Sequence, residues 1–334
     1  MMTPEQRRAS VASIERLQID SGLVLWVEGG HADPWNHVET AMALDVGGNF
    51  EAAARAYGWL AGNQRADGSW HQYYEADRIK DEKFDANTIA YVAVGVWHHY
   101  LSTQDREWLD AQWSMVSKAL SWVLQLQQPT GEILWAREPD GTPFHYALIT
   151  GSSSIHHSLG CAIDIAHELG RSAEGFVTGQ KLLGHALKHY PLEFFAEKDR
   201  WAMDWYYPVL GRVLTDDDGI SAMKARWDEF VIDGHGVRCV NDHPWVTTGE
   251  TAEAAIACAV LGLRAEAQML LDYTETLRHD DGSYWTGLHV PSGAWFPEGE
   301  RTAYSAAAVL LADAVVGDPS SPTARVFGLD PTEP

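Results

Sequence analysis

The chain has 334 residues, of which 46% are hydrophobic and 21% are charged, and its formal net charge is −23. The hydrophobic fraction excludes a disordered chain, and the excess of acids without a cluster of Lys or Arg excludes nucleic acid and anionic membranes as partners. Three Cys without CxxC spacing, and no apolar run long enough for a signal peptide or a bilayer span, predict a cytoplasmic protein without integral membrane association.

Two kinds of helix are expected to alternate along the chain. Helices that are charged on one face are expected at about 4–18, 50–64, 107–127, 172–189, 219–231 and 264–278. Helices that are apolar nearly all round are expected at about 35–47, 86–101, 151–168, 204–214, 249–262 and 301–315. A helix that is apolar on all sides is surrounded by protein, whereas an amphipathic helix faces water on one side.

Strict alternation of six outer and six inner helices predicts an all-α fold, an (α/α)6 toroid. We expect residues 1–316 to form this single domain, with the first outer helix closing the ring against the last inner helix. Residues 317–334, rich in Pro, Ser and Asp, are expected to be a poorly ordered tail. The links from outer to inner helices are long and would share one rim, at the N-termini of the inner helices, where function is expected.

A sequence motif recurs where the outer helices end. RAYGWLAGNQRADGSW at 55–70 joins a helix end, Gln64, a short turn, Gly68 and Trp70, and residues 118–133 repeat the pattern around Gln127 and Gly131. Weaker copies occupy 17–26 and 277–285. The motif resembles the QW repeat of the terpene cyclase and protein prenyltransferase superfamily. The resemblance implies a toroid in which the Gln and Trp tie outer helices together, and an enzyme acting on isoprenoids.

A second resemblance concerns residues 88–134. This segment contains an inner helix with an aromatic end, the sequence TQDREWL, an outer helix bearing Trp, and a Gly-x-Ile exit. It is similar to the six-hairpin (α/α)6 glycosidases. Those enzymes begin inner helices with carboxylates beneath long aromatic loops. This resemblance implies carbohydrate chemistry at the same rim.

Acidic residues occur near the starts of the expected inner helices. Glu39 and Asp204 belong to opposed repeats, as do Asp85 and Glu250. Opposed carboxylates flanking a sugar ring are what glycoside hydrolysis needs, one as proton donor and one as base or nucleophile. The candidate catalytic residues are Glu39, Asp85, Asp204, Glu250 and Glu300.

Polar and aromatic neighbours of these acids are the candidate substrate-binding residues. Carboxylates, amides and imidazoles can bond sugar hydroxyls, and aromatic rings can stack on sugar faces. The set is Asp33, Trp35, His37, Asn87, His156, Trp205, Tyr206, Trp245, Trp285, Glu298 and Arg301.

The polar character of this rim favours a carbohydrate-active enzyme acting on a small sugar or a glycan, because unpaired polar groups in a hydrocarbon cavity cost free energy. One alternative is a cyclase- or prenyltransferase-like enzyme, with Glu300 as the protonating acid beside Glu298. Another is a toroid that binds a glycan or a protein partner without turnover. We expect no cofactor and no metal, although Cys239, Asp242 and His243 form one possible zinc cluster. The sequence does not indicate an oligomeric state.

Overall fold

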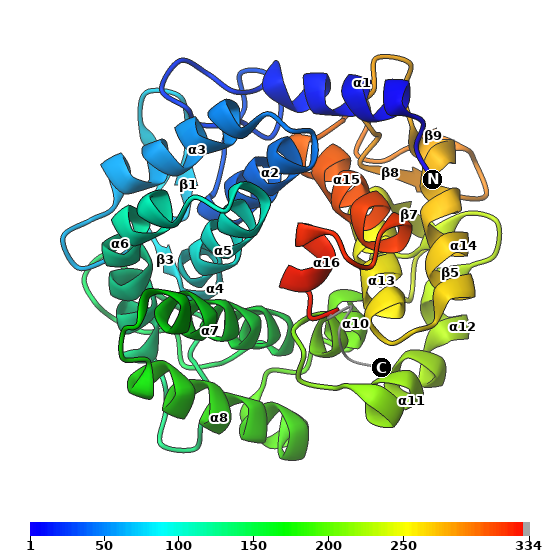
Figure 1. Cartoon of the computed structure of the whole chain (residues 1–334). Helices are drawn as coiled ribbons and strands as arrows, with labels where there is room; N and C mark the ends of the chain where they lie inside the picture. The colour runs from blue at the N-terminus through cyan, green and yellow to red at the C-terminus, as the bar shows by residue number, and fades with distance from the viewer. Residues whose placement is uncertain (330–334) are drawn as a thin grey trace.

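The computed structural model describes residues 1–329, in which helices form a closed double ring (Figure 1). The inner ring contains six helical segments within these residues, the second of them split at Tyr91: α2 (Pro34–Val46), α4 (Ala86–Ala90) with α5 (Val92–Thr103), α7 (Ile149–Leu169), α10 (Met203–Leu210), α13 (Thr248–Val260) and α15 (Ala303–Gly317). The outer ring, within the same residues, contains six helices: α1 (Pro4–Glu15), α3 (Phe50–Asn63), α6 (Arg106–Leu124), α8 (Glu174–His189), α11 (Asp216–Ala225) and α14 (Arg264–Thr274). The prediction of an (α/α)6 toroid is therefore confirmed.

Each inner segment packs against the next, and α15 packs against α2 and α1, so the first outer helix closes the ring as expected. The inner helices are apolar because protein surrounds them. In α2, for example, every residue except Asn36 and Val46 is buried. The outer helix α3 buries one face, which includes Tyr57, Trp59 and Leu60. Buried residues of the whole ring form one hydrophobic core.

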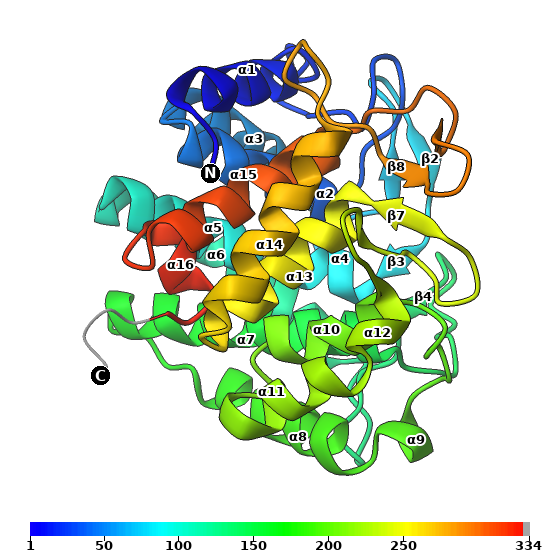
Figure 2. The ribbon, with the colours of Figure 1, turned by 90° about the vertical axis from the view of Figure 1, so that its right-hand side faces the viewer.

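The long links gather at one end of the ring, on the right in Figure 2, while the N-terminus lies toward the other end. Short antiparallel strands order these links: β1 (Tyr73–Tyr74) pairs with β2 (Ile79–Asp81), β3 (Phe84–Asp85) with β4 (Ala136–Arg137), β5 (Val231–Ile232) with β6 (Gly236–Val237), and β7 (Trp245–Thr247) with β8 (Gly287–His289), which also pairs with β9 (Ala294–Trp295). Three short helices, α9 (Pro191–Phe194), α12 (Trp227–Phe230) and the 3-10 helix Glu275–Leu277, complete the links. The expected rim of long loops over the inner-helix N-termini is confirmed.

The repeated Gln residues bind each turn to the next outer helix. The Gln18 amide donates to the carbonyl oxygens of Gly22 and Ala52, at 3.0 and 2.9 Å. Gln64 bonds Gly68 and Met115 at the same two distances. Gln127 likewise bonds Gly131, in its own turn, and Gly179, on α8. Gln64 therefore ties α3 to α6, whereas the Trp70 indole donates to the Leu60 carbonyl within α3 at 2.9 Å.

The turn glycines are packed against the same helices. Gly68 has φ +99°, and a Cβ added there would lie 2.5 Å from the Lys118 carbonyl oxygen on α6. Gly282 has φ +89°, and its added Cβ would lie 2.3 Å from the backbone of Ala9 on α1, where the ring closes. No side chain fits at either position without moving backbone.

We expect Gly68→Ala to lower the free energy of unfolding by about 2–4 kcal/mol, because backbone strain and a clash with a carbonyl act together. Gly29→Ala is the matched control, since Gly29 has φ +67° but an added Cβ there meets nothing within 4 Å. The control should lose only about 1–2 kcal/mol. Urea unfolding of both variants measures the difference, and equal losses would show that the α6 contact is unimportant.

The segment after α15 differs from the tail expected from residue 317. α15 itself extends to Gly317, and α16 (Pro322–Val326) covers the end of the ring opposite the long loops (Figure 1). Thr323, Val326 and Phe327 are buried there, and Thr323 hydrogen-bonds the His98 ring at 2.9 Å. The expectation is wrong up to residue 329, because two apolar side chains in a Pro- and Ser-rich stretch suffice to dock it. Residues 330–334 lie outside the described part.

Candidate active site

Two aspartates cap neighbouring inner helices at the rim of long loops. Asp33 precedes α2, and its Oδ1 accepts the Asn36 backbone N–H at 2.9 Å. Its Oδ2 accepts from the Trp26 indole at 2.9 Å and from the Asn36 amide at 2.7 Å. Burial raises the pKa of Asp33, while these hydrogen bonds oppose the rise. A buried carboxyl group with partners at both oxygens is held in one orientation.

Asp85 occupies the equivalent position before α4. Its Oδ1 accepts the backbone N–H groups of Asn87 and Thr88 at 2.9 and 3.2 Å, and the Trp135 side chain from the next long loop also hydrogen-bonds it. Burial raises the pKa of Asp85 to about 6, and the charge of Asp33 adds to the rise. The two aspartates therefore belong to one electrostatic group. In such a group, one carboxyl keeps its proton to higher pH.

Asp204 lies in the first turn of α10 and joins α7. Its Oδ1 accepts the Thr150 N–H at 3.2 Å and the Thr150 hydroxyl at 2.5 Å. Its Oδ2 is buried without a partner among residues 1–329. Burial raises the pKa of Asp204. This Oδ2 oxygen can therefore take part in a hydrogen bond with a ligand.

Glu250 lies in the first turn of α13 and is only partly buried. Burial raises the pKa of the Cys239 thiol above its usual range, and the nearby charge of Glu250 adds to the rise. Glu250 thus lies beside a thiol at the rim. Glu300, also half-buried, accepts a hydrogen bond from the Thr286 hydroxyl at 3.0 Å, whereas Glu298 is exposed.

A second layer of acids lies deeper in the ring. The Tyr91 hydroxyl donates to Glu39, and the hydroxyls of Tyr206 and Tyr207 donate to Glu253, the latter at 2.9 Å. Burial raises the pKa of Glu39 to about 7 and that of Glu253 to about 8. These carboxyls are protonated over much of the neutral range and stabilise the tyrosines around the axis of the ring.

Glu253 was not among the candidates from the sequence. It follows Glu250 by three residues, which places both on one face of a helix, so the signal was available in the pattern Glu-Thr-Ala-Glu. Tyr206, a candidate for substrate binding, is fully buried against Glu253. Trp35 stacks on Tyr91 with ring centroids 4.6 Å apart and contacts Tyr304, so it belongs to the same deep layer.

Aromatic pairs line the long loops above this layer. Trp245 stacks on Phe296 at 4.5 Å, and Trp285 stacks on Trp295 at 4.8 Å. Trp135, the partner of Asp85, stacks on Tyr146 at 5.4 Å. Asn87 is half-buried, and its side-chain oxygen is buried without a partner among the described residues.

Three candidates point away from the rim and a fourth bonds a turn beside it, so these expectations are corrected. His37 accepts the Val24 N–H at its Nδ1 and contacts the Ala56 carbonyl through Nε2, and burial lowers its pKa to about 4. The Trp205 indole N–H donates to carbonyls of α11. His156 binds the Gly211 carbonyl after α10, at 2.9 Å. Arg301 precedes α15, and its guanidinium bonds Asp281 and lies over the Trp285 ring at 5.1 Å. The other three side chains leave their helices on the outward face.

No group of three His, Cys, Asp or Glu side chains within residues 1–329 is arranged to hold a metal ion. Asp242, of the possible zinc cluster, pairs instead with Arg200 at 2.9 Å on the surface. In the same residues, no helix combines the length and apolar character that a bilayer span requires.

Glu253 makes stability depend on pH. Because its pKa is about 8 in the folded protein against a usual 4.5, the folded state holds more protons between these values. The contribution of Glu253 to the free energy of unfolding is therefore fully present below about pH 4.5 and is lost as pH rises through 8. We expect Glu253→Gln to reduce this slope by at most about 1.4 kcal/mol per pH unit.

Urea unfolding at pH 6, 7, 8 and 9 measures this slope. Glu174→Gln, an exposed acid in the first turn of outer helix α8, is the control and should keep the wild-type slope. Parallel curves for wild type and Glu253→Gln would show that Glu253 titrates normally.

Comparison with known proteins shows which resemblance is correct. No family model matches the chain. It is 44% identical, over 312 residues that cover 93% of this chain and 86% of the relative, to the MMP endo-(1,4)-3-O-methyl-α-D-mannosidase of Mycolicibacterium hassiacum.

Two solved structures share the fold. A wild-type glycosidase aligns with a TM-score of 0.77 at 15% identity, over 94% of this chain and 96% of that one. The GH63 mannosylglycerate hydrolase of Thermus thermophilus, in complex with glucose, aligns with a TM-score of 0.74 at 14% identity, over 91% and 99%. These similarities support the six-hairpin glycosidase resemblance and not the cyclase one. The chain is a carbohydrate-active enzyme, and it belongs to the family of the M. hassiacum mannosidase.

Proposed function

We propose that this protein is an endo-acting glycoside hydrolase that cleaves α-(1→4) linkages between 3-O-methyl-D-mannose units. The observation that carries the proposal is the 44% identity, over 93% of the chain, to an enzyme with that activity in its name. The stacked pairs Trp245–Phe296 and Trp285–Trp295 support it, because a methyl ether enlarges the apolar face that a sugar offers to an aromatic ring.

We further propose how the carboxyl groups divide the reaction. The Asp33–Asp85 pair supplies the proton donor, because both groups are buried and their pKa values are raised. Glu250 supplies the second carboxylate, as base or nucleophile, because it is partly exposed and lies in the first turn of an inner helix at the rim. Asp204 and Glu300 would bond sugar hydroxyls beside them. Hydrolysis then protonates the glycosidic oxygen while the second carboxylate assists attack at the anomeric carbon.

The test is incubation of the protein with a 3-O-methylmannose polysaccharide of α-(1→4) linkage. An endo-acting enzyme shortens the chains rapidly while new reducing ends rise slowly, and size-exclusion chromatography with a reducing-end assay shows both. Release of monomer alone, or no release at all, would contradict the proposal. Parallel incubation with isoprenoid diphosphates, which we expect to remain intact, tests the cyclase alternative.

The free thiols of Cys161, Cys239 and Cys258 suit a reducing compartment, and we propose that the protein is located in the cytoplasm.

A further inference from the structure

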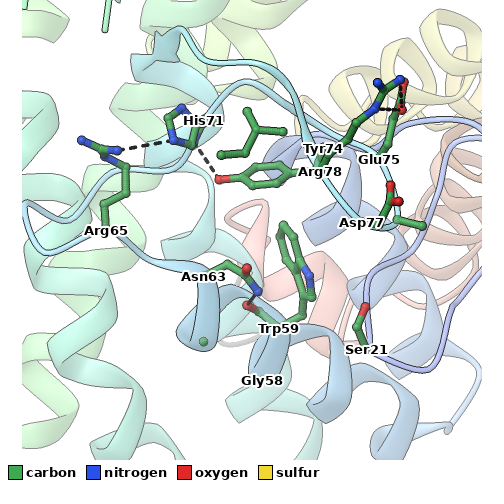
Figure 3. A pocket seen from close by; sticks show the side chains of 13 residues that line it. Ser21, Gly58, Trp59, Asn63, Arg65, His71, Tyr74, Glu75, Asp77 and Arg78 are labelled. Carbon is green, nitrogen blue, oxygen red and sulfur yellow. Dashed lines mark hydrogen bonds and ion pairs between the residues drawn. The ribbon is translucent and has the colours of Figure 1, made fainter. Parts of the chain in front are cut away.

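A groove lies beside outer helix α3 (Figure 3), and none of the rim carboxylates Asp33, Asp85, Asp204, Glu250 and Glu300 lines it. It has a volume of about 710 Å³ and separates α3 from the link that carries β1 and β2. Trp59 and Tyr74 form its inner wall, with ring centroids 4.9 Å apart and an interplanar angle of 90°. Its volume is within the range of pockets that bury small ligands, roughly 300–1,000 Å³.

Two glycines form the floor of this groove. Gly58 and Gly62 are one helical turn apart on the exposed face of α3, and an added Cβ at either would meet nothing within 4 Å. Glycine inside a helix costs about 1 kcal/mol relative to alanine. Neither the backbone conformation nor packing requires glycine here. The two glycines therefore leave the floor of the groove without side chains and lower the stability of the helix.

The opposite wall offers both donors and acceptors. The inner wall is less polar, because Tyr74 is buried and its hydroxyl accepts the His71 backbone N–H at 2.8 Å. Arg78 is paired with Glu75 at 2.6 Å, and Asp77 lies beside them (Figure 3). Because Arg78 already has an acidic partner, this lining suits a neutral polyhydroxyl ligand better than an anion.

The hairpin of β1 and β2 separates the groove from the carboxylate rim. Tyr73 is close enough to Asp33 and Asp85 for their charges to raise its pKa, after the larger effect of burial. Tyr74, the next residue, faces the groove. The pairing of β1 with β2 shifts register between these two residues, and the same short hairpin contributes to both places.

We propose that this groove is a second glycan-binding site, which holds a distant stretch of the polysaccharide while the rim cleaves another. This inference rests on the proposed function. A long chain that crosses the hairpin contacts both places, whereas a short oligosaccharide occupies the rim alone. Binding at the groove raises the effective concentration of the long chain at the rim.

The experiment uses Gly58→Leu and Gly62→Leu, which fill the groove from its floor without crowding the fold. Gly175→Leu is the matched control, because Gly175 is also helical, on α8, with open space around it. All three variants should melt at or above the wild-type temperature, since leucine favours a helix more than glycine does.

Kinetics are measured with the methylated polysaccharide and with a short oligosaccharide of the same linkage. We expect the two groove variants to raise KM about tenfold, or about 1.4 kcal/mol, for the polysaccharide only. Gly175→Leu should change neither substrate's KM. An unchanged KM in stable groove variants overturns the groove site while the proposed function stands. A wild type that cleaves neither substrate overturns the proposed function, and the groove inference with it.

Discussion

Glu250→Gln is expected to lower kcat on the methylated polysaccharide by about 10²–10⁴, the usual contribution of one acid–base group. The substitution keeps the size of the side chain and removes only its charge and basicity. The side chain of Glu250 is partly exposed in the first turn of α13, so folding should be little affected. Affinity for the uncleaved polysaccharide, measured by calorimetry, should stay within a few-fold of wild type.

Glu174→Gln, in the first turn of an outer helix, controls for the loss of a charge at a helix start and should keep full activity. This comparison also tests the non-catalytic alternative, because a binding protein has no rate to lose. If Glu250→Gln retained the wild-type kcat, another acid at the rim would have to supply the second carboxylate.

The repeat pattern was enough to predict the fold. Gln18, Gln64 and Gln127 recur at equivalent helix ends because each satisfies a carbonyl of its own turn and one of the next outer helix. The same pair of contacts is made by a Gln at each of these helix ends, so it leaves a repeated signature in the sequence. α16 leaves none, because it docks through a few side chains onto helices far away in the chain.

The direction of each side chain explains why some candidate residues lie at the rim and others point away from it. Asp33 and Asp85 cap helices, and a cap is fixed at the end of its helix, so position predicts placement. His37 comes one turn later, and its ring contacts the backbone of Val24, before α2, and of Ala56, within α3. A helix that is buried all round has no polar face to mark inward and outward sides. The sequence therefore predicts where the rim lies, but it does not predict which residues in the first two turns of each helix face the rim.

Activity should fall as pH rises above about 6, because the Asp33–Asp85 pair must carry a proton to protonate the glycosidic oxygen. The pKa of Asp85 is about 6 in the folded protein against a usual 3.8, and the pair, not either residue alone, determines the apparent value. Below this pH the proton is present, and above it the pair is fully ionised. A kcat profile between pH 4 and 9 should therefore show an alkaline limb near pH 6.

Asp33→Asn and Asp85→Asn should each lower kcat by at least about 10², again the contribution of one acid–base group. Asparagine caps a helix as well as aspartate does, so α2 and α4 should remain folded. Asp105→Asn is the matched control, because Asp105 caps outer helix α6 by accepting the Trp108 N–H at 2.9 Å. If one of the two variants keeps the alkaline limb, the aspartate that this variant retains is the proton donor. A wild-type profile without a limb near pH 6 would remove the pair from the acid role, and Asp204, with its unpartnered buried oxygen, would become the donor to test.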